Sequence, residues 1–450
     1  MSQVCFLEGD KEITWSFFCT QVESVRQTIR QTQFENVLLY HSDSYQFSIC
    51  FFALLLEQKH ILLPPNSQQE TLNQISKSAD AYMGEISLLN IPQIKCSFNN
   101  NIQLENSYKI APKLFDSLNS KITFYTSGST GKPKAIVKHS RYLLKEIETL
   151  KSTFETPLSQ TDIVLSTVSH QHIYGLLFKI LLPLRFGIKI LNQVFEYPEH
   201  IQAYLKANKS KQVTLLASPA HLKRLVEDNV LLQVKTQFEC IFSSGGPLAF
   251  DVSSLLNKQM SIAPIEVFGS TETGGIAWRR CDKTTPNDWM LFQGIKYNSV
   301  PFEDLGERLQ ISSPFMADES YLTDDLIQKV DDTHFVLKGR SDRTIKLEEK
   351  RINLEHMEQA LIRHEAIKEA KVFILNNSKR PSLVAVIAIN DIARKILCDR
   401  NKRALNECFK THLLKEFERI SLPKKWRYLN ELPFNAQGKL VQKELEVLFD

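Results

Sequence analysis

The segment ITFYTSGSTGKPKAIVKH, residues 122–139, decides the fold. Its β-branched and aromatic residues predict a strand that ends at Thr126, and a turn of Gly, Ser and Thr follows and leads to Lys132-Pro133-Lys134. The glycines let the backbone turn tightly and direct successive N–H groups toward one point, while hydroxyls and lysines add donors and positive charge. The loop therefore predicts a binding site for an anion with several oxygens, such as pyrophosphate or the outer phosphates of a nucleotide.

Two other interpretations of this segment are weaker. It is not a Walker A loop, because Thr126 stands where that motif needs its first glycine and Pro133 follows the lysine. A flexible Ser/Gly linker is the second alternative, but a linker does not normally follow a buried strand and carry paired lysines. We therefore favour a phosphate loop.

On both sides of the loop, apolar runs of strand length alternate with segments of helical spacing, which predicts parallel sheets covered by helices. Ligands of such sheets bind beyond the carboxyl ends of the strands. After about residue 340 the pattern changes to a helix at 354–364, strands at 371–375 and 383–389, and a long helical stretch from about 391 to 420. We expect an α/β fold with a large N-terminal domain of parallel sheets layered with helices over 1–341 and a small α+β C-terminal domain over 342–450.

Composition is typical of a globular chain: of 450 residues, 43% are hydrophobic and 24% charged, and the net charge is +4. From Asp342 onward there are 22 Lys/Arg against 16 Asp/Glu, whereas the preceding residues hold 33 against 35. This basic part could face an acidic carrier or protein, although solvated lysines are the commoner meaning of such a bias. No apolar run reaches the roughly 18 residues of a membrane span, and we expect neither a membrane span nor a nucleic-acid partner.

The cysteines also bear on location. The 8 cysteines are scattered without a C-x-x-C pair or framework spacing, which favours reduced thiols and a cytoplasmic protein. The N-terminal residues contain acids where a signal peptide needs a basic flank and an apolar run.

Further motifs occur along the chain after the phosphate loop. They are HQHIYG (170–175), SSGGPL (243–248), VFGSTE (267–272), YLTDD (321–325), GRSD (339–342) and LPFNAQGKLVQKEL (432–445). In this order, together with the loop, they resemble the signature motifs of the adenylate-forming (AMP-binding) superfamily, in its branch of acyl-CoA synthetases and acyl- or aryl-acid ligases. The resemblance covers the chain from about residue 35 to its end. It implies that the small domain is mobile and carries the catalytic lysine.

The resemblance implies an ATP site. The residues that it assigns to ATP are Thr126, Ser127, Gly128, Ser129, Thr130, Gly131, Lys134, Gly245, Gly246, Pro247, Phe268, Gly269, Asp325 and Arg340. Phe268 would stack on adenine, although the family usually has Tyr there. The backbone of the glycine pair would pass beside the ring, where a Cβ would collide. Asp325 would accept hydrogen bonds from both ribose hydroxyls.

Catalytic and metal-binding residues follow from the same resemblance. Thr271 would bond the α-phosphate, and Glu272 with Thr130 would hold Mg²⁺, a hard cation that prefers oxygen ligands. Lys439 matches the catalytic lysine, whose charge would stabilise the transition state between the attacking carboxylate and the α-phosphate.

The remaining positions concern the acid pocket and the hinge. His172 would be a catalytic residue that shapes or gates the acid pocket. The alternative is that His170 and His172 bind a metal as a His-x-His pair, but no further metal-binding residue is near in the sequence. Asp342 would be the hinge residue. Asp324 and Glu349 replace family glycines, and the second of these glycines lies near the path of the phosphopantetheine thiol in relatives.

These motifs predict an ATP-dependent acid–thiol ligase. A carboxylic acid would be activated as its acyl-adenylate and transferred to CoA or to the phosphopantetheine of an acyl carrier protein. The segment 165–178 lacks the Phe-Asp pair of amino-acid-activating relatives, which favours a fatty or aromatic acid. A carrier-loading or adenylate-only ligase and a non-catalytic nucleotide-binding protein are the alternatives; the acid itself and the oligomeric state stay open.

Overall fold

The computed structural model describes residues 3–9, 11–88, 90–96, 98, 119–127, 133–280, 288–303, 306–347, 350–375, 382–434, 440 and 442–450. The chain divides into two compact units. The first unit contains Met1–Lys296 and Ile311–Tyr321, and the second contains Tyr297–Gln310 and Leu322–Asp450. These units are defined by how the residues pack together. The domain boundary expected between Ser341 and Asp342 was instead placed at a hinge, and it stays a prediction.

The smaller sheet of the first unit carries the phosphate-loop segment. Its strand order is β5-β3-β4-β6-β7, with four parallel strands and β7 antiparallel to β6. The strands are β3 (Asn36–Tyr40), β4 (His60–Leu63), β5 (Ala81–Gly84), β6 (Lys121–Ser127) and β7 (Pro133–His139). The accompanying helices are α1 (Trp15–Arg30), α2 (Ser44–Leu56), α3 (Gln69–Ile75) and α4 (Ser140–Thr153).

Helix α2 shows why the sequence forms this layer. Its residues are apolar on nearly every face, and such a helix is stable only when it is buried on all sides. The structure buries Phe47, Phe51 and Phe52 almost completely. The side chain of Asp43 accepts the backbone N–H of Gln46 and begins the helix.

The larger sheet of the first unit has the order β14-β13-β12-β11-β10-β8-β9-β1-β2. Strands β12, β11, β10, β8, β9 and β1 run parallel, and β2, β13 and β14 are antiparallel to their neighbours. The bounds are β1 (Val4–Glu8), β2 (Lys11–Thr14), β8 (Ile163–Ser166), β9 (Lys189–Leu191), β10 (Val213–Ala217), β11 (Phe238–Ser243), β12 (Ile265–Ser270), β13 (Gly274–Arg280) and β14 (Trp289–Leu291).

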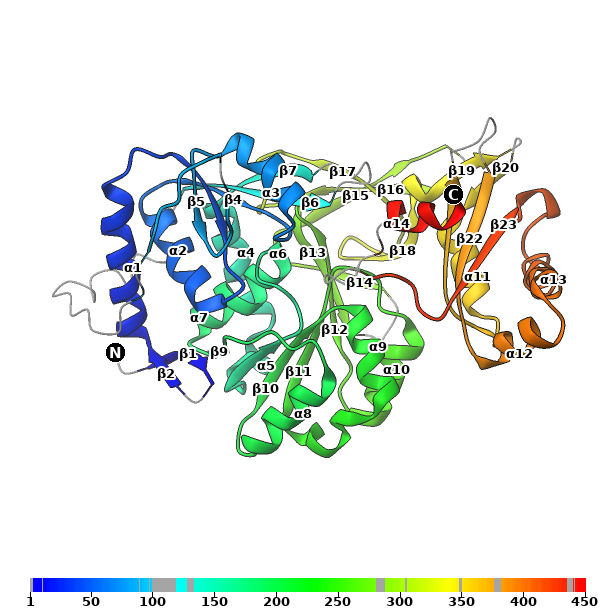
Figure 1. Cartoon of the computed structure of the whole chain (residues 1–450), viewed down its shortest axis with the longest axis horizontal. Helices are drawn as coiled ribbons and strands as arrows, with labels where there is room; N and C mark the ends of the chain where they lie inside the picture. Colours follow the sequence, from blue (N-terminus) through cyan, green and yellow to red (C-terminus); the bar gives the residue numbers. More distant parts are fainter. Residues whose placement is uncertain are drawn as a thin grey trace. The chain divides into compact units, whose positions relative to one another are not determined.

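Helices α8 (Pro198–Ala207), α9 (Pro219–Asp228) and α10 (Phe250–Met260) lie along β10 and β11 and share one apolar core with them (Figure 1). Shorter segments α5 (Glu155–Ser159), α6 (Ile173–Gly175), a π-helical turn (Leu176–Leu181) and α7 (Leu182–Phe186) connect the strands. Because β11 and β12 are parallel, their carboxyl ends bring the 243–248 and 267–272 motifs to the same edge of the sheet.

The second unit contains two sheets and a hairpin. Strands β15 (Lys296–Pro301), β16 (Glu307–Ser312), β17 (Tyr321–Lys329) and β18 (His334–Arg340) are successive neighbours. After them come the hairpin β19 (Thr344–Leu347) and β20 (Lys350–Asn353), then α11 (Leu354–Ile362), and a sheet of β21 (Ile367–Leu375), β22 (Ser382–Ile389) and β23 (Lys425–Leu429). Helices α12 (Asp391–Asp399), α13 (Lys402–Leu413) and α14 (Gln442–Glu446) complete it.

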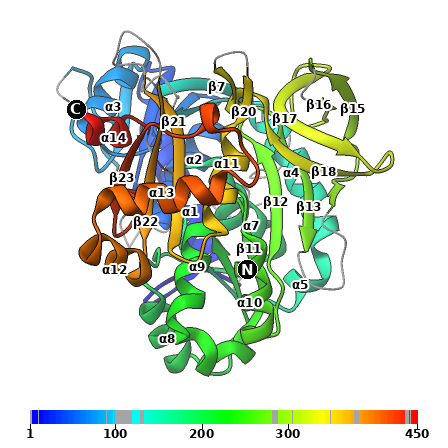
Figure 2. The same cartoon turned by 90° about the vertical axis from the view of Figure 1, so that its right-hand side faces the viewer.

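Helix α13 crosses the face of β21 and β22 (Figure 2), and Leu405, Phe409 and Leu413 join their core. The helical stretch predicted at 391–420 consists of two helices that are separated at Asn401, and the second ends at Leu413. Asn401 has a positive φ of 119° that a helix cannot contain, and its side chain accepts the N–H of Ala404 to begin α13.

The predicted α/β class and the α+β character of the C-terminal part are confirmed. Among the described residues, no helix combines the length and apolar character needed to cross a bilayer.

Replacing Gly175 with alanine should destabilise the first unit. A Cβ at this position would lie 2.0 Å from the carbonyl oxygen of Ser169, so the backbone of the 169–175 segment must shift. Overpacking of this kind costs about 1–3 kcal/mol. Thermal unfolding checks this, with Gly246→Ala as the control because its nearest atom would be 3.9 Å away. Equal melting temperatures for the two variants would contradict the expectation.

Candidate functional site

The phosphate-loop segment forms the β6–β7 hairpin. The register pairs Thr126 with Lys134 and Ser127 with Pro133, so β6 ends just before residues 128–132 and β7 begins just after them. Apolar side chains such as Ile122 and Phe124 are buried beneath the hairpin, while the side chain of Lys134 is 59% exposed. The turn itself, with Gly128, Ser129, Thr130 and Gly131, lies outside the described residues, and the phosphate-binding and metal-binding roles of these four residues stay predictions.

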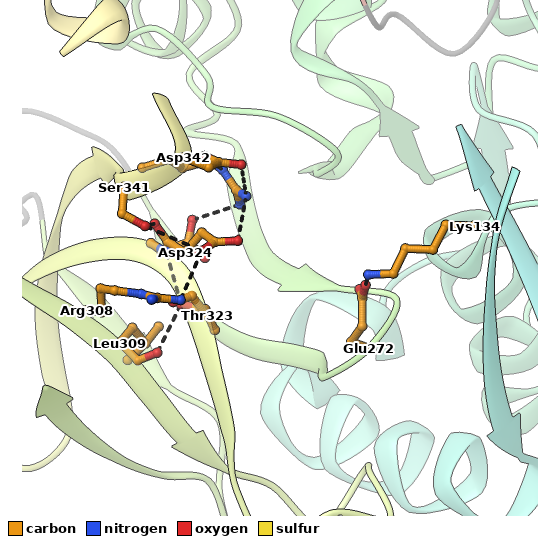
Figure 3. Close-up of polar contacts among 10 residues, drawn as sticks. Lys134, Glu272, Arg308, Leu309, Thr323, Asp324, Ser341 and Asp342 are labelled. Carbon is orange, nitrogen blue, oxygen red and sulfur yellow. Dashed lines mark hydrogen bonds and ion pairs between the residues drawn. The ribbon is translucent and has the colours of Figure 1, made fainter. Parts of the chain in front are cut away.

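An ion pair links this hairpin to the 267–272 motif. The Nζ atom of Lys134 donates to Oε1 of Glu272 at 2.6 Å (Figure 3). Partial burial alone would raise the pKa of Glu272, but the hydrogen bond and positive charge of Lys134 outweigh it, so the pKa lies below its ordinary value. The structure therefore places an ionised carboxylate and an ammonium group together, which are the charges that a metal–phosphate ligand requires.

The turn that carries Thr271 and Glu272 is braced by hydroxyl groups. The backbone N–H of Ser270 donates to Oγ1 of Thr273 at 3.2 Å, and the N–H of Thr273 donates to Oγ of Ser270 at 3.2 Å. Gly269 is required here, because a Cβ would lie 2.3 Å from the carbonyl oxygen of Gly274. The sequence after β12 thus fixes where Thr271 and Glu272 leave the sheet.

Phe268 lies at the carboxyl end of β12, half-buried against Trp289 with ring centroids 5.4 Å apart. The guanidinium of Arg279 lies 4.4 Å from the centre of the Trp289 ring and makes two hydrogen bonds, of 2.9 and 3.1 Å, to the buried carboxylate of Glu266. Trp289 and Arg279 support the predicted adenine-stacking residue, and no sequence motif identified them.

The glycine pair lies beyond β11. Gly245 has a φ of +90°, which disfavours other residues, and no described atom lies within 4 Å of where its Cβ would be. For Gly246 the nearest described atom, Cγ of Pro219, is 3.9 Å away. The hydroxyl of Ser244 donates to the carbonyl oxygen of Val267 at 2.8 Å and ties the two strand ends together. Gly245, Gly246 and Pro247 are all exposed, and their role beside adenine stays a prediction.

The 170–175 segment is fixed by its first two residues. His170 is buried, contacts the ring of Phe47 at 4.5 Å, and its Nε2 lies 2.9 Å from the carbonyl oxygen of His41. Gln171 donates to the same oxygen at 3.0 Å. Burial holds the pKa of His170 well below its usual range, so its ring is neutral. His172 precedes α6 and is half-buried; among described residues no cluster of three metal-binding side chains occurs.

The second unit brings the YLTDD and GRSD motifs together. Strand register pairs Asp325 with Arg340, and Nη1 of Arg340 lies 3.5 Å from Oδ1 of Asp325. Arg340 also makes bonds of 2.9 and 2.7 Å to the two oxygens of Asp342. Burial raises the pKa of Asp325 and the charge of Arg340 opposes this effect. The residues assigned to ribose, phosphate and hinge are thus neighbours.

Asp324, which replaces a family glycine, is paired within this unit. Arg308 donates to its carboxylate at 2.9 Å and to the carbonyl oxygen of Thr323 at 2.8 Å, and Ser341 donates to the Asp324 carbonyl at 3.0 Å (Figure 3). Arg308 lies on β16 in no recognisable motif, so sequence reasoning missed it. Lys439 and Glu349 lie outside the described residues.

Several known proteins are similar in sequence to this chain. The sequence model of the family described as AMP-binding enzyme matches residues 89–296. Acetyl-coenzyme A synthetase from Chlorobaculum tepidum is 23% identical, with 75% of this chain and 56% of that protein covered. 4-Coumarate–CoA ligase from Cereibacter sphaeroides is 23% identical, with 71% and 70% covered. The chain thus spans little more than half the length of the first of these relatives.

Solved structures share the fold across the whole chain. ATP-bound MatB from Rhodopseudomonas palustris matches with a TM-score of 0.75 at 14% identity, covering 100% of this chain and 96% of that one. The anthranilate CoA ligase AuaEII, in complex with anthranoyl-AMP, matches with a TM-score of 0.74 at 16% identity, covering 99% and 94%. The predicted fold class is therefore confirmed.

Replacing Lys134 with methionine should raise the pKa of Glu272. The substitution removes the hydrogen bond and the positive charge but leaves the burial that favours the neutral carboxyl group. The pKa of Glu272 is lower in the folded wild type than in the unfolded chain. The ion pair therefore stabilises the fold at pH values above the ordinary pKa of a glutamate, and this stabilisation is lost as the pH falls through the lowered pKa of Glu272.

A ¹³C titration of the Glu272 carboxyl group measures the shift. Lys145→Met is the matched control, because Lys145 lies near the Tyr142 ring on α4 and is not among the groups that shift Glu272. An unchanged Glu272 pKa in Lys134→Met would show that the pair does not form in solution.

Proposed function

We propose that this chain, a member of the adenylate-forming (AMP-binding) superfamily, activates a carboxylic acid with ATP and transfers the acyl group to a thiol. The observation that carries the proposal is the Lys134–Glu272 pair, which joins the phosphate-loop hairpin to the aromatic-Gly-x-Thr-Glu turn. The two motifs are 138 residues apart in the sequence, yet their functional groups meet at 2.6 Å. The ordered match of the remaining motifs supports the same chemistry.

The described residues fit the groups that this reaction needs. Glu272 is an ionised oxygen donor beside a cation, and such a carboxylate suits Mg²⁺. Glu272, with Thr130, would hold the metal, which neutralises phosphate charge when bound. The half-exposed face of Phe268 and the open backbone at 245–246 suit adenine, and Asp325 with Arg340 suits ribose and phosphate.

In the first step an oxygen of the substrate carboxylate attacks the α-phosphorus of ATP, a P–O bond forms, and the bond to the β-phosphate breaks as pyrophosphate leaves. The loop hydroxyls and Lys134 would bind the leaving diphosphate, Thr271 would donate to the α-phosphate, and Lys439 would stabilise the charge that develops between the reactants. Such a step depends on alignment and charge neutralisation rather than on covalent help from the protein.

In the second step a thiol attacks the acyl carbon and AMP leaves with the bonding electron pair. Asp342 would be the hinge about which the small domain rotates between steps. The acceptor is CoA or the phosphopantetheine of a carrier protein, because both carry the same reacting thiol. Glu349 stands where the family has a glycine, so a carrier-loading or adenylate-only ligase is the second candidate.

His172 and Tyr174 would shape the pocket for a fatty or aromatic acid. A cytoplasmic location is part of this proposal, and the free thiols of the described cysteines support it.

Acid-dependent exchange of labelled pyrophosphate into ATP tests the proposal. With a panel of fatty and aromatic acids and Mg²⁺, at least one acid should promote incorporation of label well above the acid-free rate. Product analysis with CoA and with a holo-carrier protein then separates the two acceptors. If no acid promotes exchange and calorimetry detects no ATP binding, the ligase assignment is wrong.

Replacing Lys439 with alanine should separate the two half-reactions. Loss of a cation used only in the adenylation transition state should slow pyrophosphate exchange by about 10²–10³-fold, the usual effect of removing one such group. Thioester formation from a supplied acyl-adenylate should change by less than about 3-fold, because the charge has no role in that step. Lys443→Ala, an exposed position on α14, is the control. Equal loss in both half-reactions would contradict the assigned role.

A further inference from the structure

A buried carboxylate lies beneath the turn that carries Thr271 and Glu272. Glu146 projects from the middle of α4 and is only 2% exposed, and its Oε1 accepts the backbone N–H of Gly275 at 2.6 Å. Its Oε2 has no hydrogen-bond partner among the described residues. Burying a carboxylate with incomplete hydrogen bonding costs free energy, so this residue is a poor choice for stability alone.

The turn and the carboxylate fit each other closely. Gly274 has a φ of +76°, and a Cβ there would lie 2.7 Å from Oε2 of Glu146. A Cβ at Gly275 would lie 3.3 Å from Oε1 of Glu146 and 3.1 Å from the ring of Phe292. Two consecutive glycines therefore leave room for the carboxylate to reach the backbone where β13 begins. Side chains at either position would push the turn away from α4.

A buried lysine lies in the same region. Lys138 on β7 is 3% exposed and donates to the carbonyl oxygen of Phe315 at 2.9 Å. Its positive charge acts on both Glu146 and Glu272, and burial lowers its own pKa. Phe315 in turn lies against the Gly274 backbone, and Ser313 donates to the carbonyl oxygen of Thr273 at 3.4 Å.

These contacts place the turn between Lys134 and Glu146, which lie on the strand and the helix that come next in the sequence after the phosphate loop. On the exposed side, Lys134 of β7 binds the side chain of Glu272, and on the buried side Glu146 of α4 binds the backbone at Gly275. We propose that Glu146 is a positioning residue, which sets the location of Thr271 and Glu272 relative to the phosphate loop through its hydrogen bond to Gly275. The catalytic consequence rests on the proposed function; the structural part does not.

Two substitutions distinguish the effect of the position of the Glu146 acceptor oxygen from the effect of its charge. Glu146→Asp keeps the charge but withdraws the carboxylate by about 1.5 Å, the length of one carbon–carbon bond. Glu146→Gln keeps an acceptor oxygen at the original reach and removes the charge. Glu148→Gln is the matched control, because Glu148 lies on the same helix, is exposed and pairs with Arg185.

In the pyrophosphate exchange assay, Glu146→Asp should lower kcat by about 10–100-fold, the effect of a displacement of about 1 Å at a reacting centre. The KM for the acid should stay within about 2-fold, and Glu146→Gln should retain kcat within about 5-fold because its amide oxygen replaces the acceptor. A loss in Glu146→Gln with an unaltered Glu146→Asp would overturn the inference in favour of a charge effect. Equal losses in the two variants would also overturn it, because the acceptor oxygen that Glu146→Gln retains would then make no difference.

Amide hydrogen exchange provides a readout that needs no substrate. The Gly275 amide and the 270–276 peptide should exchange faster by at least about 10-fold in Glu146→Asp than in wild type, and at the wild-type rate in Glu148→Gln. Unchanged protection in Glu146→Asp refutes the positioning role whatever the activity. If wild-type protein shows no exchange of pyrophosphate with any acid but the amide result holds, the proposed function fails while the hydrogen bond stands. Melting temperatures report whether each variant is folded.

Discussion

The contact between Lys134 and Glu272 joins the two sheets of the first unit, since β7 belongs to the smaller sheet and the turn after β12 to the larger one. The lysine side chain is 59% exposed, and exposed ion pairs contribute little to stability, typically about 0–1 kcal/mol. Its importance is therefore geometric. A phosphate chain repels carboxylates, so a carboxylate that is to hold a metal beside phosphates needs a nearby cation to keep it ionised and in place. In the proposed function, Lys134 of β7 would be that cation.

Strand β12 is held by buried carboxylates at both ends. Near its beginning, Glu266 is 2% exposed and binds Arg279 through both oxygens, and Arg279 in turn packs over the ring of Trp289 that supports Phe268. Beyond its end, Glu146 binds the backbone of Gly275. A buried ion pair is often no more stabilising than an apolar replacement, but it restricts the geometry that the chain can adopt. Both carboxylates hold the strand whose end carries Phe268 and the turn with Thr271 and Glu272, so precise placement explains them better than stability does.

The sequence predicted the groups that lie in continuous motifs and missed those that reach the site from elsewhere. Phe268, Thr271 and Glu272 lie in one continuous motif, so the resemblance to the family could assign them roles, which stay predictions. Trp289 and Arg308 escaped notice because each lies on a different strand and is brought near by sheet pairing, which a single sequence does not reveal.

Two other features depend on the contacts of single residues, namely the break between α12 and α13 and the pairing of Asp324. The break at Asn401 was missed because apolar spacing continues through it, and only the positive φ of that residue and its cap to Ala404 separate α12 from α13. Asp324 stands in place of a family glycine and adds a negative charge next to Asp325 in the sequence. In the structure Arg308 lies 2.9 Å and Arg340 3.6 Å from its carboxylate, so the charge is neutralised inside the second unit. Arg340 is thereby shared among Asp324, Asp325 and Asp342. A ligand that recruits Arg340 would leave Asp324 paired with Arg308, and the substitution is therefore compatible with a ribose-binding role for Asp325.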